Sequence, residues 1–122
     1  MSTILVVDDE YVICDILGFA LEDAGYQVEK ASGGKKALEV LQKTRVELLI
    51  TDYMMPEMDG KQLATELRER PGMMALPIIL MSGAQAGIGR ENPELFNEVL
   101  QKPFEPEEMI RLVNKLVGPP GE

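Results

Sequence analysis

The sequence places a lone carboxylate, Asp52, directly after an apolar run, Leu48–Thr51. The run has no polar alternation, which is typical of a strand buried on both faces of a parallel sheet. A turn follows, marked by Pro56 and by the Asp59–Gly60 dipeptide. The carboxyl end of a strand in an open α/β sheet faces the crevice where such sheets bind ligands. We therefore predict that Asp52 is the central functional group of this protein.

Four further polar side chains follow other apolar runs in the same way. They are Asp8, Asp9, Ser82 and Lys102. Because the carboxyl ends of parallel strands meet at one edge of a sheet, we expect three carboxylates, a hydroxyl and an ammonium to gather there. Clustered carboxylates repel one another and need a cation, and hard oxygen ligands suit Mg²⁺. A lysine and a hydroxyl beside them can hold phosphoryl oxygens. The set therefore predicts phosphoryl transfer onto a carboxylate.

Each of these residues also has a purely structural interpretation. The Asp8–Asp9 pair could cap the helix that follows it, since Asp is a good N-cap residue. Asp52 could be a turn residue, although a lone acid that ends a buried strand is costly unless it is paired. Lys102 could be a surface charge, but its position between a strand and Pro103–Phe104 argues otherwise, and Ser82 alone is uninformative. The functional interpretation depends on these residues occurring together.

Apolar runs alternate with helical patterns along the chain and predict the elements that position these residues. This alternation predicts an α/β fold with a doubly wound, five-stranded parallel sheet in the order 2-1-3-4-5, as a flavodoxin-like three-layer sandwich. Between Gly83 and Asn97, three glycines and Pro93 disfavour a long helix, so we expect a mobile loop and then a short helix over 93–97. We expect the strands near 4–7, 26–31, 48–51, 77–82 and 99–101, and the other helices near 13–24, 37–43, 63–67 and 105–117.

Length and composition exclude several classes of protein. The 122 residues fit one domain with a sizeable core. The net charge of −9 argues against direct nucleic-acid binding, which needs a basic face, and the sequence has no histidine. No apolar run reaches the ~20 residues of a membrane span, and no charged-then-apolar leader is visible. The single cysteine, Cys14, fits a reducing compartment and an inert core position. We expect a cytoplasmic protein that does not bind a membrane.

Over residues 3–117 the chain resembles the receiver domain of two-component response regulators. The resemblance rests on the Asp8–Asp9 pair, Asp52 in TDYMMPEMDG, Ser82, and Lys102 in QKPF, in this order and spacing. It implies a signalling phosphoacceptor rather than an enzyme, in which Asp52 takes a phosphoryl group from a sensor histidine kinase or a phosphotransfer protein. Residues 1–117 would be the receiver, and residues 118–122 would be a tail or the start of a linker.

The resemblance also implies roles for the neighbouring residues. Asp8, Asp9 and Asp52, with the backbone carbonyl of Met54, would hold Mg²⁺, for which Mn²⁺ can substitute. Ser82 would move to the phosphoryl group, and Lys102 would pair with it, with a cis peptide bond between Lys102 and Pro103. The downstream effector or output domain stays open, as does a homodimer formed on phosphorylation.

One position departs from the usual receiver pattern, and two others bear on the lifetime of the phosphoryl group. Receivers usually carry Tyr or Phe three residues before the lysine, but Val99 stands there, and Phe96 lies at a different spacing. We therefore expect ordering of the loop from Gly83 to Asn97 to carry the signal. Met54 and Ala84 occupy the positions that overlook the approach of a hydrolytic water, and neither side chain can orient one. This predicts slow loss of the phosphoryl group.

Two other functions fit parts of the pattern. A phosphatase with an aspartyl nucleophile, of the haloacid-dehalogenase type, would need a second acid two residues after Asp52, where Met54 stands. A flavodoxin-like nucleotide binder would need a first loop rich in Gly, Ser or Thr, where this chain has Asp8, Asp9 and Glu10. Flavin absorbance or turnover of a phosphate ester would favour these alternatives.

Overall fold

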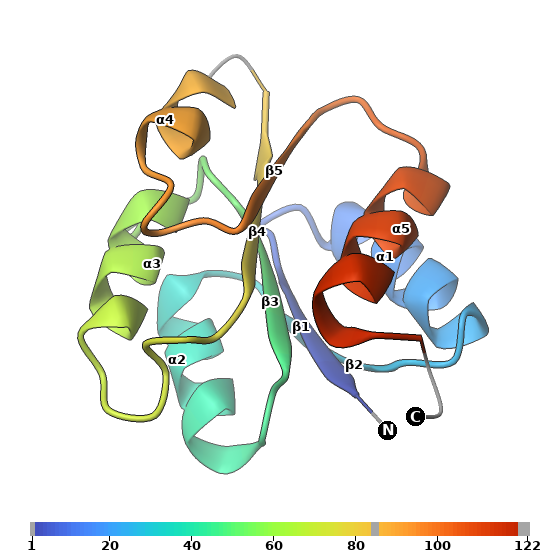
Figure 1. Ribbon diagram of the computed structural model, residues 1–122, viewed down its shortest axis with the longest axis horizontal. Coiled ribbons are helices and arrows are strands. Elements are labelled where there is room, and N and C mark those ends of the chain that lie inside the picture. Colours follow the sequence, from blue (N-terminus) through green and yellow to red (C-terminus); the bar gives the residue numbers. More distant parts are fainter. Residues whose placement is uncertain (1, 84–85, 120–122) are drawn as a thin grey trace.

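The computed structural model describes residues 2–83 and 86–119, in which strands and helices alternate (Figure 1). The strands are β1 (Thr3–Val7), β2 (Gln27–Ala31), β3 (Leu48–Asp52), β4 (Ile78–Ser82) and β5 (Glu98–Gln101). The helices are α1 (Tyr11–Asp23), α2 (Gly34–Lys43), α3 (Gly60–Arg68), α4 (Ala86–Glu91) and α5 (Pro106–Val117). The strands form one parallel sheet in the order β2-β1-β3-β4-β5, which confirms the predicted fold and strand order.

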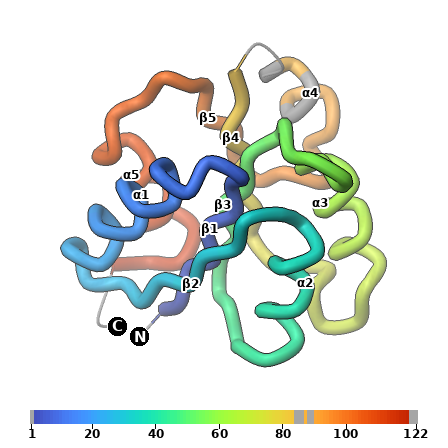
Figure 2. The backbone as a smooth tube through the Cα atoms, turned by 180° about the vertical axis from the view of Figure 1, so that it is seen from behind, coloured from blue at the N-terminus to red at the C-terminus, as the bar shows by residue number. Residues whose placement is uncertain are grey.

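The helices form two layers, one on each face of the sheet. Helices α1 and α5 lie side by side on one face and α2, α3 and α4 on the other, as the opposite views in Figures 1 and 2 show. An apolar cluster fills the space between the sheet and each layer. Strands β1, β3 and β4 are buried along their whole length, because successive side chains enter opposite clusters. This explains their continuous apolar sequences.

The turn after β3 brings helix α3 back against the end of that strand. Asp59 is the N-cap of α3: its carboxylate accepts the N–H of Gln62, and the Gln62 side chain accepts the N–H of Asp59, both at 2.8 Å. Gly60 is buried, and a Cβ atom there would lie 2.5 Å from the carbonyl oxygen of Asp52. Glycine permits this close backbone approach. The Asp59–Gly60 dipeptide therefore seats α3 directly beside Asp52.

The short helix expected over 93–97 was predicted in the wrong place. Helix α4 spans Ala86–Glu91, and residues 93–95 form a turn. The N–H groups of Leu95 and Phe96 both donate to the carbonyl of Asn92, at 2.9 and 3.3 Å, and both side chains are buried in the cluster under α2 and α3. The glycine penalty, about 1 kcal/mol per residue, did not prevent a short helix. The prediction missed that burial of two apolar side chains dictates the turn.

Arg68 fixes the chain that follows this turn to the rest of the domain. Its guanidinium donates to the carbonyl oxygens of Leu76 at 2.7 Å and Leu95 at 2.9 Å, and to the side-chain oxygen of Asn97 at 3.3 Å. The same Asn97 oxygen accepts the N–H of Ile78 at 2.8 Å. Arg68 thus joins the end of α3 to the segments that lead into β4 and β5.

Helix α5 ends where the sequence predicts a tail to begin. Its last residue is Val117, and the N–H of Gly118 donates to the carbonyl of Asn114 at 2.9 Å. Residues 120–122 of the predicted tail lie outside the described part of the chain. Within residues 2–83 and 86–119, no helix combines the length and apolar character needed to cross a membrane.

Candidate functional site

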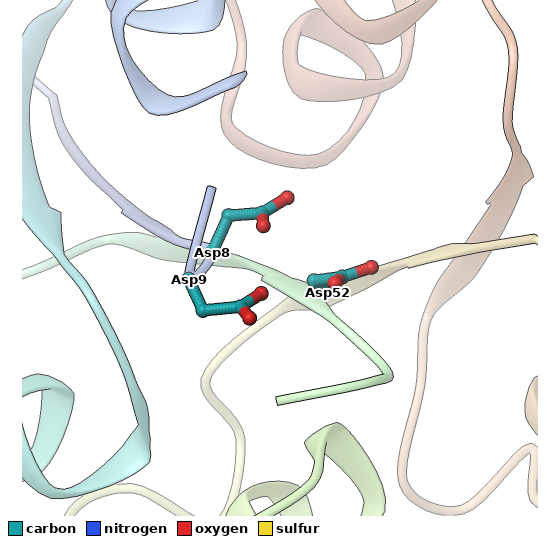
Figure 3. A group of neighbouring side chains, drawn as sticks. All are labelled: Asp8, Asp9 and Asp52. Carbon is teal, nitrogen blue, oxygen red and sulfur yellow. The ribbon is translucent and has the colours of Figure 1, made fainter. Parts of the chain in front are cut away.

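Three carboxylates from neighbouring strands meet at one edge of the sheet. Asp8 and Asp9 follow β1, and Asp52 ends the adjacent strand β3. Figure 3 shows their side chains lying close together, and one oxygen from each lies within 4.8 Å of the others. Asp8 is 0% and Asp52 is 6% exposed, whereas Asp9 is exposed. The strand ends therefore bring the three predicted acids together.

The Asp8–Asp9 pair does not cap helix α1. The N-cap residue is Glu10, and it makes no side-chain capping bond. Instead, the N–H of Glu10 donates to Oδ1 of Asp8 at 2.9 Å. The Asp8 carboxylate also lies in the cluster with Asp9 and Asp52, so the capping interpretation is wrong and the clustered one holds.

Lys102 supplies the positive charge of the site. Its Nζ lies 3.1 Å from Oδ1 of Asp52 and 3.3 Å from Oδ2 of Asp8. Its backbone N–H donates to the carbonyl of Ser82 at 2.7 Å, which anchors the end of β5 beside β4. The peptide bond between Lys102 and Pro103 is cis, as the resemblance implies. One ammonium therefore bridges the ends of two central strands.

Ser82 brings a hydroxyl that has no partner. Its side chain is 0% exposed, and its Oγ makes no hydrogen bond within the described part of the chain. A buried unsatisfied hydroxyl costs about 1–3 kcal/mol, so such groups need an explanation. A hydroxyl at the carboxyl end of β4, one strand from Asp52, is placed to donate to an oxygen atom that arrives at the site.

Burial and charge act in opposite directions on the site's ionisable groups. Burial raises the pKa of Asp8 and of Asp52 above 3.8, although their hydrogen bonds and the charge of Lys102 lower both in part. Burial lowers the pKa of Lys102, but its bond and charge interactions with Asp52 and Asp8 outweigh this, so the net shift is upward. The lysine is therefore charged at neutral pH, and its charge only partly offsets the effect of burial on the pKa values of the two carboxylates.

These shifts give the stability of the protein a distinct pH dependence. Because the folded pKa values of Asp8 and Asp52 lie above their ordinary values, the folded state binds protons more tightly than the unfolded chain in that interval. Without a divalent cation, the free energy of unfolding contributed by these groups should fall as pH rises from 3.8 through the raised pKa values.

Denaturant unfolding of the wild type and of Asp52→Asn at a series of pH values would measure this effect. The variant cannot titrate at position 52, so its stability relative to the wild type should improve as pH rises. Addition of Mg²⁺ should stabilise the wild type more than the variant, since the ion binds the folded carboxylates. A stability difference that does not change with pH would contradict the assignment.

The remaining predicted residues lie around this cluster. Met54 follows Asp52 closely and is 60% exposed, and Pro103 is exposed beyond Lys102. Val99 is half-buried and packs against the cluster under α2 and α3. Gly83 follows Ser82, with open space where a side chain would lie. Ala84 lies outside the described residues.

The cluster has the chemistry of a Mg²⁺ site. All three groups offer carboxylate oxygens, which hard cations prefer, and the exposed Asp9 leaves a side open to water. The two buried carboxylates, Asp8 and Asp52, share the ammonium of Lys102 as their ion-pair partner, so the site retains negative charge when both are ionised. The residues present therefore fit a divalent cation.

Comparison with known proteins agrees with this site. Residues 4–114 match the family described as "Response regulator receiver domain". The chain belongs to this family. The receiver is 36% identical over 117 residues to the two-component response regulator ORR3 of Oryza sativa subsp. indica, covering 93% of this chain and 89% of that protein.

Solved structures show the same fold. The receiver matches the chemotaxis protein CheY4 of Vibrio cholerae with a TM-score of 0.89 and 29% identity, covering 96% of this chain and 99% of the other. It also matches the receiver domain of the sensor histidine kinase PA1611 from Pseudomonas aeruginosa PAO1, with a TM-score of 0.86, 27% identity, and 96% and 98% coverage. That structure has a magnesium ion coordinated in its active site cleft.

Family membership decides between the functions weighed from the sequence. The cluster of Asp8, Asp9 and Asp52 is the acidic pocket typical of phosphoacceptor receivers. The chain is therefore a phosphoacceptor receiver of two-component signalling, and not an aspartyl phosphatase or a flavodoxin-like nucleotide binder.

Proposed function

We propose that Asp52 is the phosphoacceptor, and that it takes its phosphoryl group from a phosphohistidine of a sensor histidine kinase or a phosphotransfer protein. The observation that carries this proposal is the ion pair between Asp52 and the ammonium of Lys102, next to the end of β4, where the hydroxyl of Ser82 is buried and unpartnered. Incubation with a small phosphodonor, with and without Mg²⁺, followed by intact mass measurement tests it. A single Mg²⁺-dependent phosphoryl adduct is the expected result.

The chain's own groups carry out the transfer in one displacement. An oxygen of Asp52 forms a bond to phosphorus while the bond between phosphorus and the donor imidazole nitrogen breaks, and the imidazole leaves with the electron pair. Lys102, now 3.1 Å from Oδ1 of Asp52, pairs with a phosphoryl oxygen, and Ser82 donates its hydroxyl to another. Both interactions strengthen as charge develops on those oxygens.

The acidic residues would hold the metal ion. Asp8, Asp9 and Asp52 with the backbone carbonyl of Met54 form the proposed ligand set, and Mn²⁺ can replace Mg²⁺ there because both prefer oxygen ligands. The bound ion would neutralise charge on the phosphoryl oxygens during transfer. The magnesium ion in the Pseudomonas aeruginosa receiver supports this assignment.

The receiver's wider context follows from the same proposal. A histidine kinase or phosphotransfer partner implies a cytoplasmic location. Residues 1–117 constitute the receiver, and residues 118–122 form a tail or the start of a linker. The net charge of −9 disfavours direct contact of this domain with nucleic acid, so its output passes through a downstream effector, an output domain or a homodimer formed on phosphorylation.

Ser82 should couple phosphorylation to the chain that follows it. Phosphorylation of the wild type should protect backbone amides of residues 83–91 from exchange, because the hydroxyl moves to the new charge. The buried Leu95 and Phe96 and the bonds from Arg68 limit this segment to residues before 92. Ser82→Ala should still accept phosphate but lose the protection, as amide exchange on both proteins would show.

The same variant has a stability signature. Ser82→Ala removes an unpartnered buried hydroxyl, so the unphosphorylated protein should gain about 1 kcal/mol. The matched control is Thr51→Val. The buried hydroxyl of Thr51 donates to the carbonyl of Asp52 at 2.9 Å, so its removal should destabilise the protein. Equal protection in Ser82→Ala and the wild type would contradict the coupling.

The phosphoryl group should leave Asp52 slowly. Hydrolysis needs a water held in line with the phosphorus, and neither Met54 nor Ala84 offers an acceptor that could hold it. The double variant Met54→Asn, Ala84→Glu supplies an amide and a carboxylate, and should speed the loss on the order of tenfold or more. Phosphate release after rapid removal of the donor, at fixed Mg²⁺, measures the rate.

A conservative double variant controls for the loss of the native side chains. Met54→Leu with Ala84→Val changes the same positions without adding an acceptor, and should decay like the wild type. If the Asn and Glu variant decays no faster than this control, water positioning does not limit the rate. Because loss of the phosphoryl group by the wild type is slow, the signal ends mainly through a partner phosphatase or by return of the phosphoryl group to a kinase.

A further inference from the structure

The loop between β3 and α3 contains a strained residue. Glu57 has a φ of 68°, in the left-handed region that residues other than glycine rarely adopt. Such conformations persist only where the surrounding structure enforces them, and they cluster at functional sites. This loop begins at Tyr53, directly after Asp52, and contains Met54, whose carbonyl is a proposed metal ligand.

The loop contacts the start of helix α2 through a glycine. Gly34 is buried, and a Cβ atom there would lie 2.6 Å from Sδ, 3.0 Å from Cγ and 3.1 Å from Cβ of Met58. Met58 is half-buried and packs against the cluster under α2 and α3. The Sδ atom can move by rotation of the side chain, but Cβ of Met58 is fixed to the backbone, so relief of the 3.1 Å contact needs a shift of a few tenths of an ångström in the backbone. A methyl group at position 34 would therefore displace the loop backbone.

Other interactions hold the loop on itself and on the core: the N–H of Met58 donates to the carbonyl of Pro56 at 2.7 Å, and Met55 packs against the cluster under α2 and α3. The N–H of Gly60 donates to the carbonyl of Tyr53 at 2.8 Å, which closes the base of the loop. Lys35 and Glu57 form an ion pair at 3.0 Å, but both side chains are largely exposed, so the pair contributes little. The packing of Met58 on Gly34 is therefore the main contact between the strained part of the loop and helix α2.

We infer that Gly34 and Met58 are positioning residues for the cation site, because their contact fixes the β3–α3 loop and with it the backbone at Met54. The inference rests on the proposed function for the part played by the Met54 carbonyl. Neither residue touches the ion in this arrangement. Groups that orient metal ligands from outside the ligand set commonly change metal affinity by tenfold or more when they are altered.

A Mg²⁺ titration by calorimetry of the full chain tests this inference. Gly34→Ala should raise the Kd for Mg²⁺ about tenfold, because the loop moves away from its position. Gly33→Ala is the matched control: the neighbouring glycine has extended backbone, and no atom lies within 4 Å of an added Cβ. Its Kd should equal that of the wild type. An unchanged Kd in Gly34→Ala would overturn the inference.

A second substitution separates loop position from general damage. Met58→Ala opens the space that the new methyl group needs, so Gly34→Ala with Met58→Ala should bind Mg²⁺ more tightly than Gly34→Ala alone. Amide exchange of residues 53–58 should follow the same order. A double variant no better than Gly34→Ala would overturn the inference. If Gly34→Ala does not fold, Met58→Ala alone decides: its Kd should rise by a smaller factor, and an unchanged Kd overturns the inference.

The same experiments distinguish failure of the inference from failure of the proposed function. If the wild type binds no Mg²⁺, or if Asp9→Asn does not weaken its binding, then the proposed metal site is wrong. Amide exchange of residues 53–58 still tests the packing contact in that case, since it needs no metal. Exchange that stays unchanged in Gly34→Ala would then overturn the positioning role as well.

Discussion

We expect Asp52→Asn to accept no phosphoryl group under conditions in which the wild type gains one. An amide lacks the nucleophilic oxygen of a carboxylate, and loss of the attacking group commonly lowers a rate by at least about a thousandfold. The substitution keeps the size of the side chain and removes a buried charge whose pKa burial raises, so the variant should fold. Intact mass after incubation with a small phosphodonor and Mg²⁺ is the measurement.

A second acid provides the control for this experiment. Asp59 lies on the same loop but caps helix α3, and Asn is also a good N-cap residue. Asp59→Asn should therefore be phosphorylated like the wild type. A persistent phosphoryl adduct on Asp52→Asn would show that another residue is the acceptor. Equally fast phosphorylation of the wild type without Mg²⁺ would refute the role of the metal.

Lys102→Ala should separate metal binding from phosphoryl transfer. The ammonium lies 3.1 Å from Asp52 and 3.3 Å from Asp8, so it competes with a metal ion for the same carboxylates. Its removal should leave the affinity for Mg²⁺ unchanged or higher. Phosphoryl transfer should nevertheless slow about a hundredfold, because the positive charge of Lys102 that stabilises the phosphoryl oxygens is lost. Mg²⁺ titration and the initial rate of phosphorylation measure the two effects.

Lys115 offers a matched control for the loss of positive charge. It lies on α5, is largely exposed and pairs with Glu98 at 2.7 Å, away from the acidic cluster. Lys115→Ala should change neither Mg²⁺ affinity nor the phosphorylation rate by more than the weak effect of net charge. Much weaker Mg²⁺ binding in Lys102→Ala would mean that the lysine supports the metal site instead of competing with it.

Residues at strand ends were predictable from the sequence, because a strand that is buried on both faces has a continuous apolar sequence that ends with the strand. Asp8, Asp52 and Ser82 each follow such a run, and the parallel order of the sheet then brings them together. Lys102 was harder to place from pattern alone, since β5 is short and only half-buried.

Contacts between distant segments left no comparable signal in the sequence. Leu95 and Phe96 are buried at a turn where the helix was expected, and no local pattern records which cluster receives them. The packing of Met58 on Gly34 joins a loop to the start of helix α2, and neither residue's own segment records the contact. A homologue alignment that pairs such positions would supply the missing information.

The unpartnered hydroxyl of Ser82 also affects where the phosphoryl group resides at equilibrium. The unpartnered hydroxyl raises the free energy of the unmodified protein, whereas under the proposed role of Ser82 a phosphoryl oxygen would accept its hydrogen bond in the modified protein. The free-energy difference between the phosphorylated and the unmodified protein is therefore smaller than for a free acyl phosphate and its carboxylate. Each 1.4 kcal/mol of that difference changes the equilibrium constant of transfer about tenfold. The equilibrium of phosphoryl transfer from a histidine donor then favours the receiver more strongly, and the reverse transfer starts from a more stable acyl phosphate.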